Sequence, residues 1–232
     1  MTAAAPMARK TADGKSRVRR AVAALEKRFG APTVRRRHDL IGSFVLTSLS
    51  QHTSDLNAGR AFDALKQRFP TWEQVAGATP RQIAAAIRSA GLANQKAPRI
   101  RTFVRWVNDT FGGYDLSPIR KMADEEIVRL LTSVKGIGIK TVSVVMLFSL
   151  GRDVFPVDTH VHRICRRLGL VPQKATAEQT HHRMAPLVPK GKSMSLHVNL
   201  LRLGRTICHA RGPLCPDCPL KRLCDYAKAS AT

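Results

Sequence analysis

Four cysteines form the densest group of chemically active residues in this sequence. Cys208, Cys215, Cys218 and Cys224 are separated by six, two and five residues, and the chain holds five cysteines in total. Closely spaced thiolates are typical metal ligands, and disulfides are disfavoured inside cells. The spacing predicts a tetrahedral zinc site or an iron-sulfur cluster, because both accept four sulfurs. The fifth cysteine, Cys165, falls on the apolar face of a predicted helix and is expected in the core.

A second candidate site is the stretch from Val134 to Asp158. Apolar residues at helical spacing precede Gly136 and follow Gly138, so the two glycines predict a tight connection between two helices. Backbone amides at the start of the second helix would form an anion site suited to a phosphate. An ordinary helix-helix turn is the alternative, and Gly-x-Gly by itself favours that interpretation.

Lys140 and Asp158 carry the reactive groups of this stretch. Lys140 falls in the first turn of the second predicted helix, where the macrodipole disfavours a cation by about 0.3–1 kcal/mol. The same field favours the neutral amine, which is the nucleophilic form. A solvated surface lysine is the alternative in so basic a chain. Asp158 precedes another predicted helix and suits its N-cap, and we expect the stretch to bring it within reach of Lys140.

The elements that position these residues are predicted to be helices. Apolar residues recur at helical spacing along most of the chain, with short glycine and proline breaks, which favours an all-α fold. Residues 1–15 are predicted to be a disordered basic arm, followed by a helix from Ser16. The run Arg35–Arg37 is predicted to be a basic loop, either solvated or in contact with phosphates. Asp39 opens a strongly apolar helix that ends at 50–53.

The charge balance points to a polyanionic partner. Lysine and arginine number 39 against 16 acidic residues, which gives a net charge of +23. Nucleic acid is favoured over a membrane surface, because the predicted helices direct their apolar faces toward a core. No run approaches the about 18 apolar residues of a membrane span, and no signal-peptide pattern opens the sequence. We therefore expect a cytoplasmic, nucleoid-associated protein, with an organelle transit peptide as the alternative.

Several segments together resemble the endonuclease III type of DNA glycosylase. These segments are V-K-G-I-G-I-K-T at 134–141, V-D-T-H at 157–160, L-S-Q-H-T at 49–53, G-L-A-N-Q-K-A at 91–97 and C-H-A-R-G-P-L-C-P-D-C-P-L-K-R-L-C at 208–224. The resemblance implies a two-domain helix-hairpin-helix glycosylase fold with DNA bound across the cleft. A central helical domain at 39–151 would contain the hairpin, and both chain ends, 16–38 and 152–232, would form the cluster domain.

The resemblance also implies a role for each candidate residue. Lys140 would be the nucleophile that forms a Schiff base with the sugar, and Asp158 would assist proton transfer. Gln51 would fill the gap left by a flipped base, and Leu92 would be a wedge in the base stack, whereas a leucine tucked into the core is the alternative. Gly136 and Gly138 would approach DNA phosphates. His52 has no assigned role.

The resemblance implies an activity and a cofactor as well. Cys208, Cys215, Cys218 and Cys224 would hold a 4Fe-4S cluster with a structural and DNA-positioning role. The expected activity is base removal from duplex DNA followed by cutting of the strand at the abasic site, by a monomer, with oxidised pyrimidines as the default substrate. Thr132 replaces a glutamate that relatives often carry, which puts the substrate range in doubt. The alternatives are a monofunctional mismatch glycosylase and a non-catalytic iron-sulfur DNA-binding protein.

Overall fold

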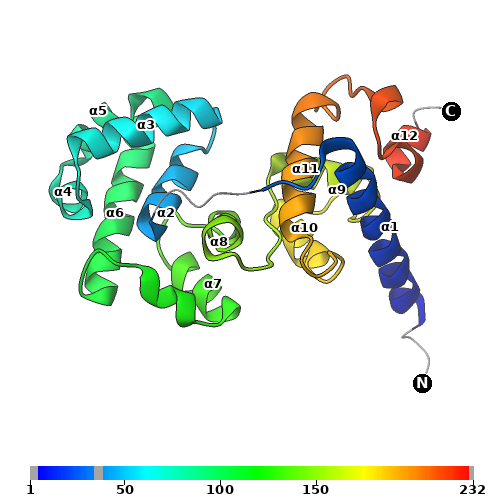
Figure 1. The fold of residues 1–232 in the computed structure, drawn as a ribbon, viewed down its shortest axis with the longest axis horizontal. Coiled ribbons are helices and arrows are strands. Elements are labelled where there is room, and N and C mark those ends of the chain that lie inside the picture. The colour runs from blue at the N-terminus through cyan, green and yellow to red at the C-terminus, as the bar shows by residue number, and fades with distance from the viewer. Residues whose placement is uncertain (1–4, 34–38, 230–232) are drawn as a thin grey trace. The chain divides into compact units, whose positions relative to one another are not determined.

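The computed structural model describes residues 5–33 and 39–229, and only the backbone of residues 5–12 (Figure 1). Within these ranges the chain forms helices and connecting segments without any strand, which confirms the all-α prediction. Contacts divide the chain into two compact units: Arg36–Leu150, here called the hairpin unit, and Met1–Arg35 with Gly151–Thr232, here called the cysteine unit. The basic loop expected at Arg35–Arg37 lies outside the described residues.

The hairpin unit is built from seven α-helices within its described part. They are α2 (Leu40–Leu49), α3 (Asp55–Arg68), α4 (Trp72–Gly77), α5 (Pro80–Ala86), α6 (Ala93–Phe111), α7 (Asp124–Thr132) and α8 (Ile139–Val145). Short 3-10 turns occur at Arg88–Ala90 and Ser117–Lys121, and a π-helical turn, Met146–Leu150, extends α8. In the core of the unit, α2 packs against α6 and α8, with the Phe44 and Phe103 rings 5.0 Å apart.

Local hydrogen bonds set the helix boundaries in the hairpin unit. Asp39 caps α2 as predicted: one carboxylate oxygen accepts from Gly42 N at 2.6 Å, and the other accepts from Trp72 Nε1 at 3.1 Å. Thr71 and Thr79 each form a capping box with a glutamine three residues later. Gly112, in the left-handed region at φ +71°, ends α6. The chain therefore folds here largely as its local pattern predicts.

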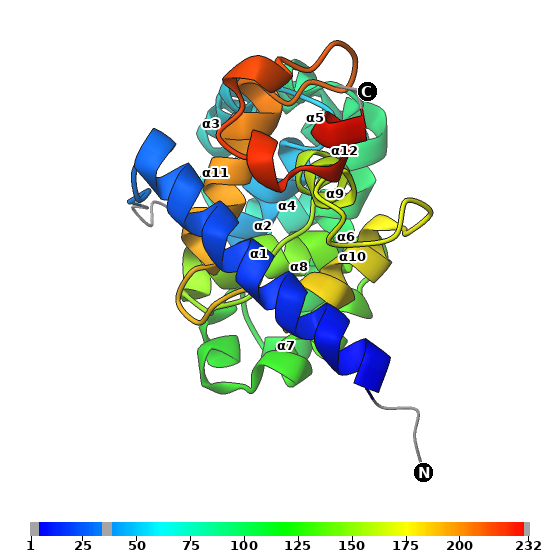
Figure 2. The same cartoon turned by 90° about the vertical axis from the view of Figure 1, so that its right-hand side faces the viewer.

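The cysteine unit has five α-helices within the described ranges. They are α1 (Ala5–Phe29), α9 (Thr159–Arg167), α10 (Ala177–Met184), α11 (Ser193–Thr206) and α12 (Asp225–Ala229). Short 3-10 turns at Cys215–Asp217 and Lys221–Leu223 lie between α11 and α12. Helix α11 packs against both α9 and α1, as the two views of the ribbon show (Figures 1 and 2). The core of the unit includes Leu25, Val161, Cys165, Leu200 and Leu203, and Cys165 is buried as expected.

The start of α1 differs from the prediction. The helix begins at Ala5 rather than Ser16, so residues 5–15 are helical instead of forming a disordered arm. Gly14 lies against the core, since a Cβ there would be 3.2 Å from the Leu187 side chain. Asp13 also pairs with Arg17 one turn later at 3.7 Å. Residues 1–15 were predicted to be disordered because their sequence has no apolar period. In the structure, the contact between Gly14 and the distant Leu187 favours the helix.

Candidate active site and cysteine cluster

The two glycines of the hairpin have different backbone conformations. Gly136 adopts φ +94°, a region that favours glycine, and a Cβ at this position would lie 3.2 Å from Arg99 Cδ. Gly138 is extended at φ −99° and acts as the N-cap of α8, where its carbonyl accepts from Thr141 N at 2.9 Å. Position 136 therefore requires glycine for its conformation, whereas position 138 does not.

Lys140 is the second residue of α8 and is partly buried. Its neighbour Thr141 is 4% exposed and points into the unit. The structure thus places Lys140 in the first turn of the helix that follows the hairpin, as the sequence predicts. A further turn of π-helix, Met146–Leu150, continues this element until Gly151 ends it at φ +73°.

Gln51 and Leu92 lie in two segments of the hairpin unit that the sequence singled out. Gln51 follows the end of α2, and its Nε2 donates to Thr141 Oγ1 at 3.3 Å. Leu92 precedes α6, is 48% exposed and has φ +48°. Leu92 is therefore exposed rather than buried in the core. Its function as a wedge stays a prediction.

Asp158 belongs to the cysteine unit, whereas Lys140 belongs to the hairpin unit. Asp158 caps α9 as predicted, since its Oδ1 accepts from Val161 N at 2.8 Å. The expectation that its carboxylate faces Lys140 stays a prediction. Its second carboxylate oxygen makes no part of this cap, so capping and proton transfer are compatible roles.

The four cysteines line one cavity of the cysteine unit, together with Arg167 and Tyr226. All four are free thiols, with Cys224 buried and the others partly buried. Burial, together with a smaller effect of charge on the three other cysteines, raises the pKa of the Cys218 thiol to about 11. Burial also raises the pKa of Cys224. The thiolates that metal ligation needs therefore require a cationic centre beside them.

Two arginines of α9 hold the chain around Cys208, and the sequence reasoning missed both. Arg163 donates to Cys208 O at 2.8 Å, and Arg167 donates to Cys208 Sγ at 3.1 Å and to His209 O at 2.7 Å. The guanidinium of Arg167 also lies over the Tyr226 ring at 4.6 Å. Their spacing of four residues places them on one helix face, which is the signal that would have identified them.

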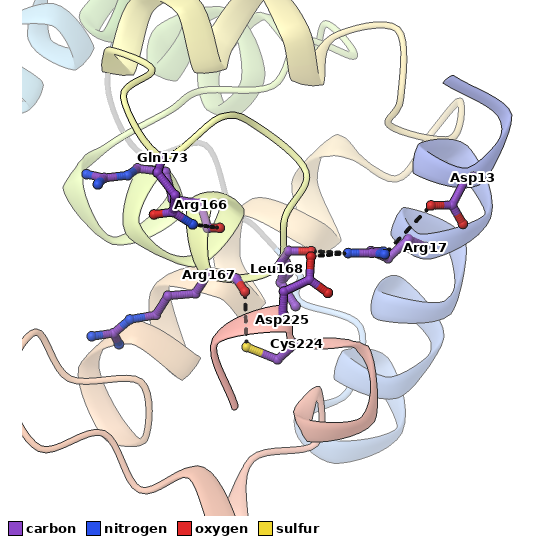
Figure 3. Close-up of polar contacts among 8 residues, drawn as sticks. All are labelled: Asp13, Arg17, Arg166, Arg167, Leu168, Gln173, Cys224 and Asp225. Carbon is purple, nitrogen blue, oxygen red and sulfur yellow. Dashed lines mark hydrogen bonds and ion pairs between the residues drawn. The ribbon is translucent and has the colours of Figure 1, made fainter. Parts of the chain in front are cut away.

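The last cysteine, Cys224, is also attached to helix α9. Cys224 Sγ contacts Arg167 O at 3.3 Å, and Arg17 from α1 bridges Leu168 O and Asp225, the latter at 3.0 Å (Figure 3). Helix α9 therefore anchors both ends of the cysteine loop. A Cβ at Gly169 would lie 1.9 Å from Asp225 Oδ2, so the close approach requires glycine there.

The four cysteine thiols fit an iron-sulfur cluster as ligands, although their side chains do not converge on a single metal position. In the described ranges, no three His, Cys, Asp or Glu side chains are placed to hold a metal ion as they stand. Four free thiols nevertheless surround a single cavity, and Arg167 already donates to one of the sulfurs. Thiolate ligands with hydrogen-bond donors around the sulfurs are what such a cluster requires.

Residues 45–190 match the HhH-GPD superfamily of base excision DNA repair proteins. The chain is 32% identical over 200 residues to Endonuclease III of Thermotoga maritima, which covers 86% of this chain and 88% of that protein. It is 35% identical over 179 residues to a candidate DNA glycosylase of Arabidopsis thaliana, which covers 77% of this chain but 58% of the longer plant protein.

Among solved structures, the fold matches a trapped covalent intermediate of Endonuclease III with DNA at a TM-score of 0.81 and 25% identity, covering 94% of this chain and 99% of the other. The chain therefore belongs to the HhH-GPD superfamily of base excision DNA repair proteins, as an endonuclease III-like DNA glycosylase. No helix in the described ranges has the length and apolar character of a membrane span.

Proposed function

We propose that this protein is a bifunctional DNA glycosylase and abasic-site lyase that acts on duplex DNA through Lys140. The observation that carries the proposal is the position of Lys140, second residue of α8 and directly after the Gly136–Gly138 connection, in a chain of this superfamily. A helix start favours the neutral amine, and the neutral amine is the nucleophile.

The proposed reaction begins with base removal. A damaged base must leave the stack before its glycosidic bond can be reached. Lys140 Nζ forms a bond to C1′ while the C1′–N bond breaks, and the base departs with that electron pair and takes up a proton. The amine nitrogen loses a proton, and Asp158 assists these transfers and stabilises the positive charge that develops on the sugar.

Strand cutting follows on the same covalent adduct. Opening of the sugar ring, with a proton added to O4′, gives the imine between C1′ and Lys140. Loss of a C2′ proton then breaks the C3′–O bond, and the 3′ phosphate leaves with the electron pair. Water hydrolyses the imine and returns the free amine.

The DNA contacts of the proposal come from both sides of the extruded base. Gln51 would occupy the gap in the stack, Leu92 would separate the bases, and the backbone at Gly136 and Gly138 would meet phosphates.

The net charge of +23 supports a DNA partner. Affinity should fall steeply with salt as phosphate contacts release counterions, and an affinity independent of salt would contradict DNA as the partner. We take the protein to act as a monomer.

Cys208, Cys215, Cys218 and Cys224 would hold a 4Fe-4S cluster. When bound, the cluster supplies fixed cross-links within the loop and no step of base removal. Lys221 and Arg222 lie inside this loop and are exposed, so ligation would fix basic side chains for phosphate contact.

The substrate is proposed to be an oxidised pyrimidine. Thr132 is exposed at the end of α7, and its hydroxyl donates to Val128 O at 2.6 Å within its own helix. A hydroxyl used in this way offers a base edge one neutral acceptor oxygen, whereas a carboxylate in its place would offer two charged acceptor oxygens. The range of bases should therefore differ from that of relatives with an acid here.

Borohydride trapping tests the proposal. The protein is incubated with duplexes that each carry one defined lesion, and with an oligonucleotide that carries a plain abasic site. We expect a covalent adduct from the natural sequence and none from Lys140→Gln. Lys135→Gln is the matched control, because Lys135 is an exposed lysine of the same hairpin and should leave trapping intact.

Each of the other outcomes would indicate a different function for this protein. Base removal without any trapped adduct would indicate a monofunctional glycosylase. DNA binding without either reaction would indicate a non-catalytic protein. Full activity of Lys140→Gln would overturn the assignment of the nucleophile.

A further inference from the structure

Lys96 is a buried cation with an unusual set of partners. Lys96 is only 4% exposed, and burial lowers the pKa of its ammonium group. Nζ donates to Leu49 O at 2.7 Å, to Gln51 O at 2.7 Å and to Ala90 O at 2.8 Å. Three carbonyls therefore use all three donors of the ammonium, and none of these acceptors is a carboxylate.

The three carbonyls belong to the ends of two helical elements. Leu49 is the last residue of α2, and Gln51 follows the C-cap residue Ser50. Ala90 ends the 3-10 turn Arg88–Ala90. Carbonyls at helix ends have no partner within their helix and carry the negative end of the dipole, so a buried cation there is stabilised without a counter-ion.

The same residue also contacts Leu92 through its backbone. Lys96 N donates to Leu92 O at 3.0 Å in the first turn of α6. The side chain of Lys96 thus holds the Gln51 segment, while its backbone and its bond to Ala90 hold the segment that carries Leu92. The two segments lie about 40 residues apart in sequence and meet at this one ammonium.

Both segments carry backbone strain at the point where they are held. Among the described residues, only His52 and Leu92 are non-glycine residues with positive φ, at +56° and +48°. Such conformations persist where the surrounding structure over-determines them, and they are concentrated at functional sites. Leu92 is itself proposed to contact DNA, and His52 directly follows Gln51, which is also proposed to contact DNA.

We propose that Lys96 is a positioning residue that fixes Gln51 and Leu92 relative to each other, so that gap filling and wedging occur as one step. This inference rests on the proposed function, which assigns DNA contacts to the two side chains. Lys96 itself is buried, so we expect it not to touch the DNA. It acts through the two segments, and its loss should uncouple them.

The chain offers a matched control for a lysine that bonds to carbonyls. Lys66, on α3 of the same unit, donates to Pro70 O, lies 4.1 Å from the Trp72 ring centroid and also has its pKa lowered by burial. These partners of Lys66 lie outside the segments that carry Gln51 and Leu92. Lys66→Met therefore removes a lysine–carbonyl hydrogen bond of the same unit and should leave the positions of Gln51 and Leu92 unchanged.

The test measures lesion preference by binding, which does not require knowledge of the natural lesion. The probe is a duplex with one tetrahydrofuran abasic analogue, with 2-aminopurine in the opposite strand to report unstacking. The measured quantity is the ratio of its affinity to that of the undamaged duplex. Gln51→Ala and Leu92→Ala are each made in the natural sequence and in the Lys96→Met background, which gives two double-mutant cycles.

We expect Lys96→Met to lower this ratio about tenfold and to reduce the 2-aminopurine signal. Gln51→Ala and Leu92→Ala should each lower the ratio about tenfold in the natural sequence but less than twofold in the Lys96→Met background. Lys66→Met should leave the ratio unchanged. Full and additive losses in the Lys96→Met background, or an equal loss from Lys66→Met, would overturn the inference.

Two further measurements keep the outcome interpretable. If Lys96→Met does not fold, the same cycles are made with Lys96→Gln, which retains donors for fewer carbonyls and should give partial uncoupling. Borohydride trapping of the natural sequence on a single-stranded abasic oligonucleotide reads the Lys140 chemistry separately. Failure of trapping would contradict the proposed function, whereas additivity in the binding cycles would contradict only the role of Lys96.

Discussion

The side-chain amide of Gln51 donates to the hydroxyl of Thr141 at 3.3 Å, and Thr141 follows Lys140 in α8. The residue proposed to fill the gap in DNA is therefore attached to the helix that carries the proposed nucleophile. The acceptor residue is buried, at 4% exposure, whereas Gln51 is half-buried, so this contact is only partly accessible to water. The proposed gap filling and the proposed chemistry are therefore connected within one unit of the protein.

Gln51→Ala should slow base removal from duplex DNA about tenfold or more, because the vacated space in the stack would stay unfilled. The measurement is the single-turnover rate on a duplex with one oxidised pyrimidine. The rate of strand cutting on a single-stranded abasic oligonucleotide serves as the control, since no gap forms there. An equal loss on both substrates would contradict gap filling.

Leu92→Ala should slow base removal to a similar extent while leaving stability within about 0.5 kcal/mol, because Leu92 is an exposed residue. Leu56→Ala is the matched control, since Leu56 is an exposed leucine of the same unit, 64% accessible on α3. The single-turnover rate and the thermal midpoint Tm are measured for both variants. A wedge role is contradicted if the two leucines behave alike.

Asp158 has two separable roles, which a pair of substitutions distinguishes. Asp158→Asn retains a good N-cap for α9, so Tm should change little while strand cutting falls sharply. Asp158→Ala should lose the activity as well and also about 0.5–2 kcal/mol of stability. Normal activity of Asp158→Asn at unchanged Tm would restrict this residue to capping.

The cysteine loop should contain iron and sulfide in the purified protein. Cys215→Ser should lower the iron content and Tm, because one ligand is lost and the loop between α11 and α12 is released. Cys165→Ser is the control: burial raises the pKa of that thiol to about 12, and it lies in the core, so its loss should leave iron unchanged. Iron and acid-labile sulfide are assayed per chain. Zinc in place of iron would contradict the cluster.

Stability should fall as pH drops from about 7 to 5. Burial lowers the pKa of His181, whose Nδ1 lies 3.0 Å from Phe155 O, and burial also lowers the pKa of His162. A histidine whose folded pKa lies below its unfolded value of about 6.5 binds protons preferentially in the unfolded chain. Stability is therefore fully present above about pH 6.5 and is lost as the pH falls below it, by at most about 1.4 kcal/mol per pH unit for each histidine.

The measurement for these histidines is Tm against pH. Replacing both His162 and His181 with Gln should flatten the curve between pH 7 and 5, whatever the change in Tm at pH 8. The comparison within one variant removes the effect of lost packing. An unaltered slope would show that other groups set the pH dependence.

The sequence by itself determined the local structure and the chemical inventory. The caps at Asp39, Thr71, Thr79 and Asp158 and the turn at Gly136 follow from hydrogen bonds and dihedral preferences that span a few residues. The spacing of the four cysteines likewise identified them as candidate metal ligands, because ligand spacing is a local property of the chain. The all-α fold was readable from helical periodicity for the same reason.

Only the tertiary structure decided which polar and apolar groups are buried. The sequence left Leu92 between core and surface, began α1 at Ser16 instead of Ala5, and gave no sign that Lys96 is enclosed. The partners of Lys96 include Leu49 O, 47 residues away, and Gly14 of α1 meets Leu187. Burial depends on segments that are distant in sequence, and no local pattern specifies which of them will meet.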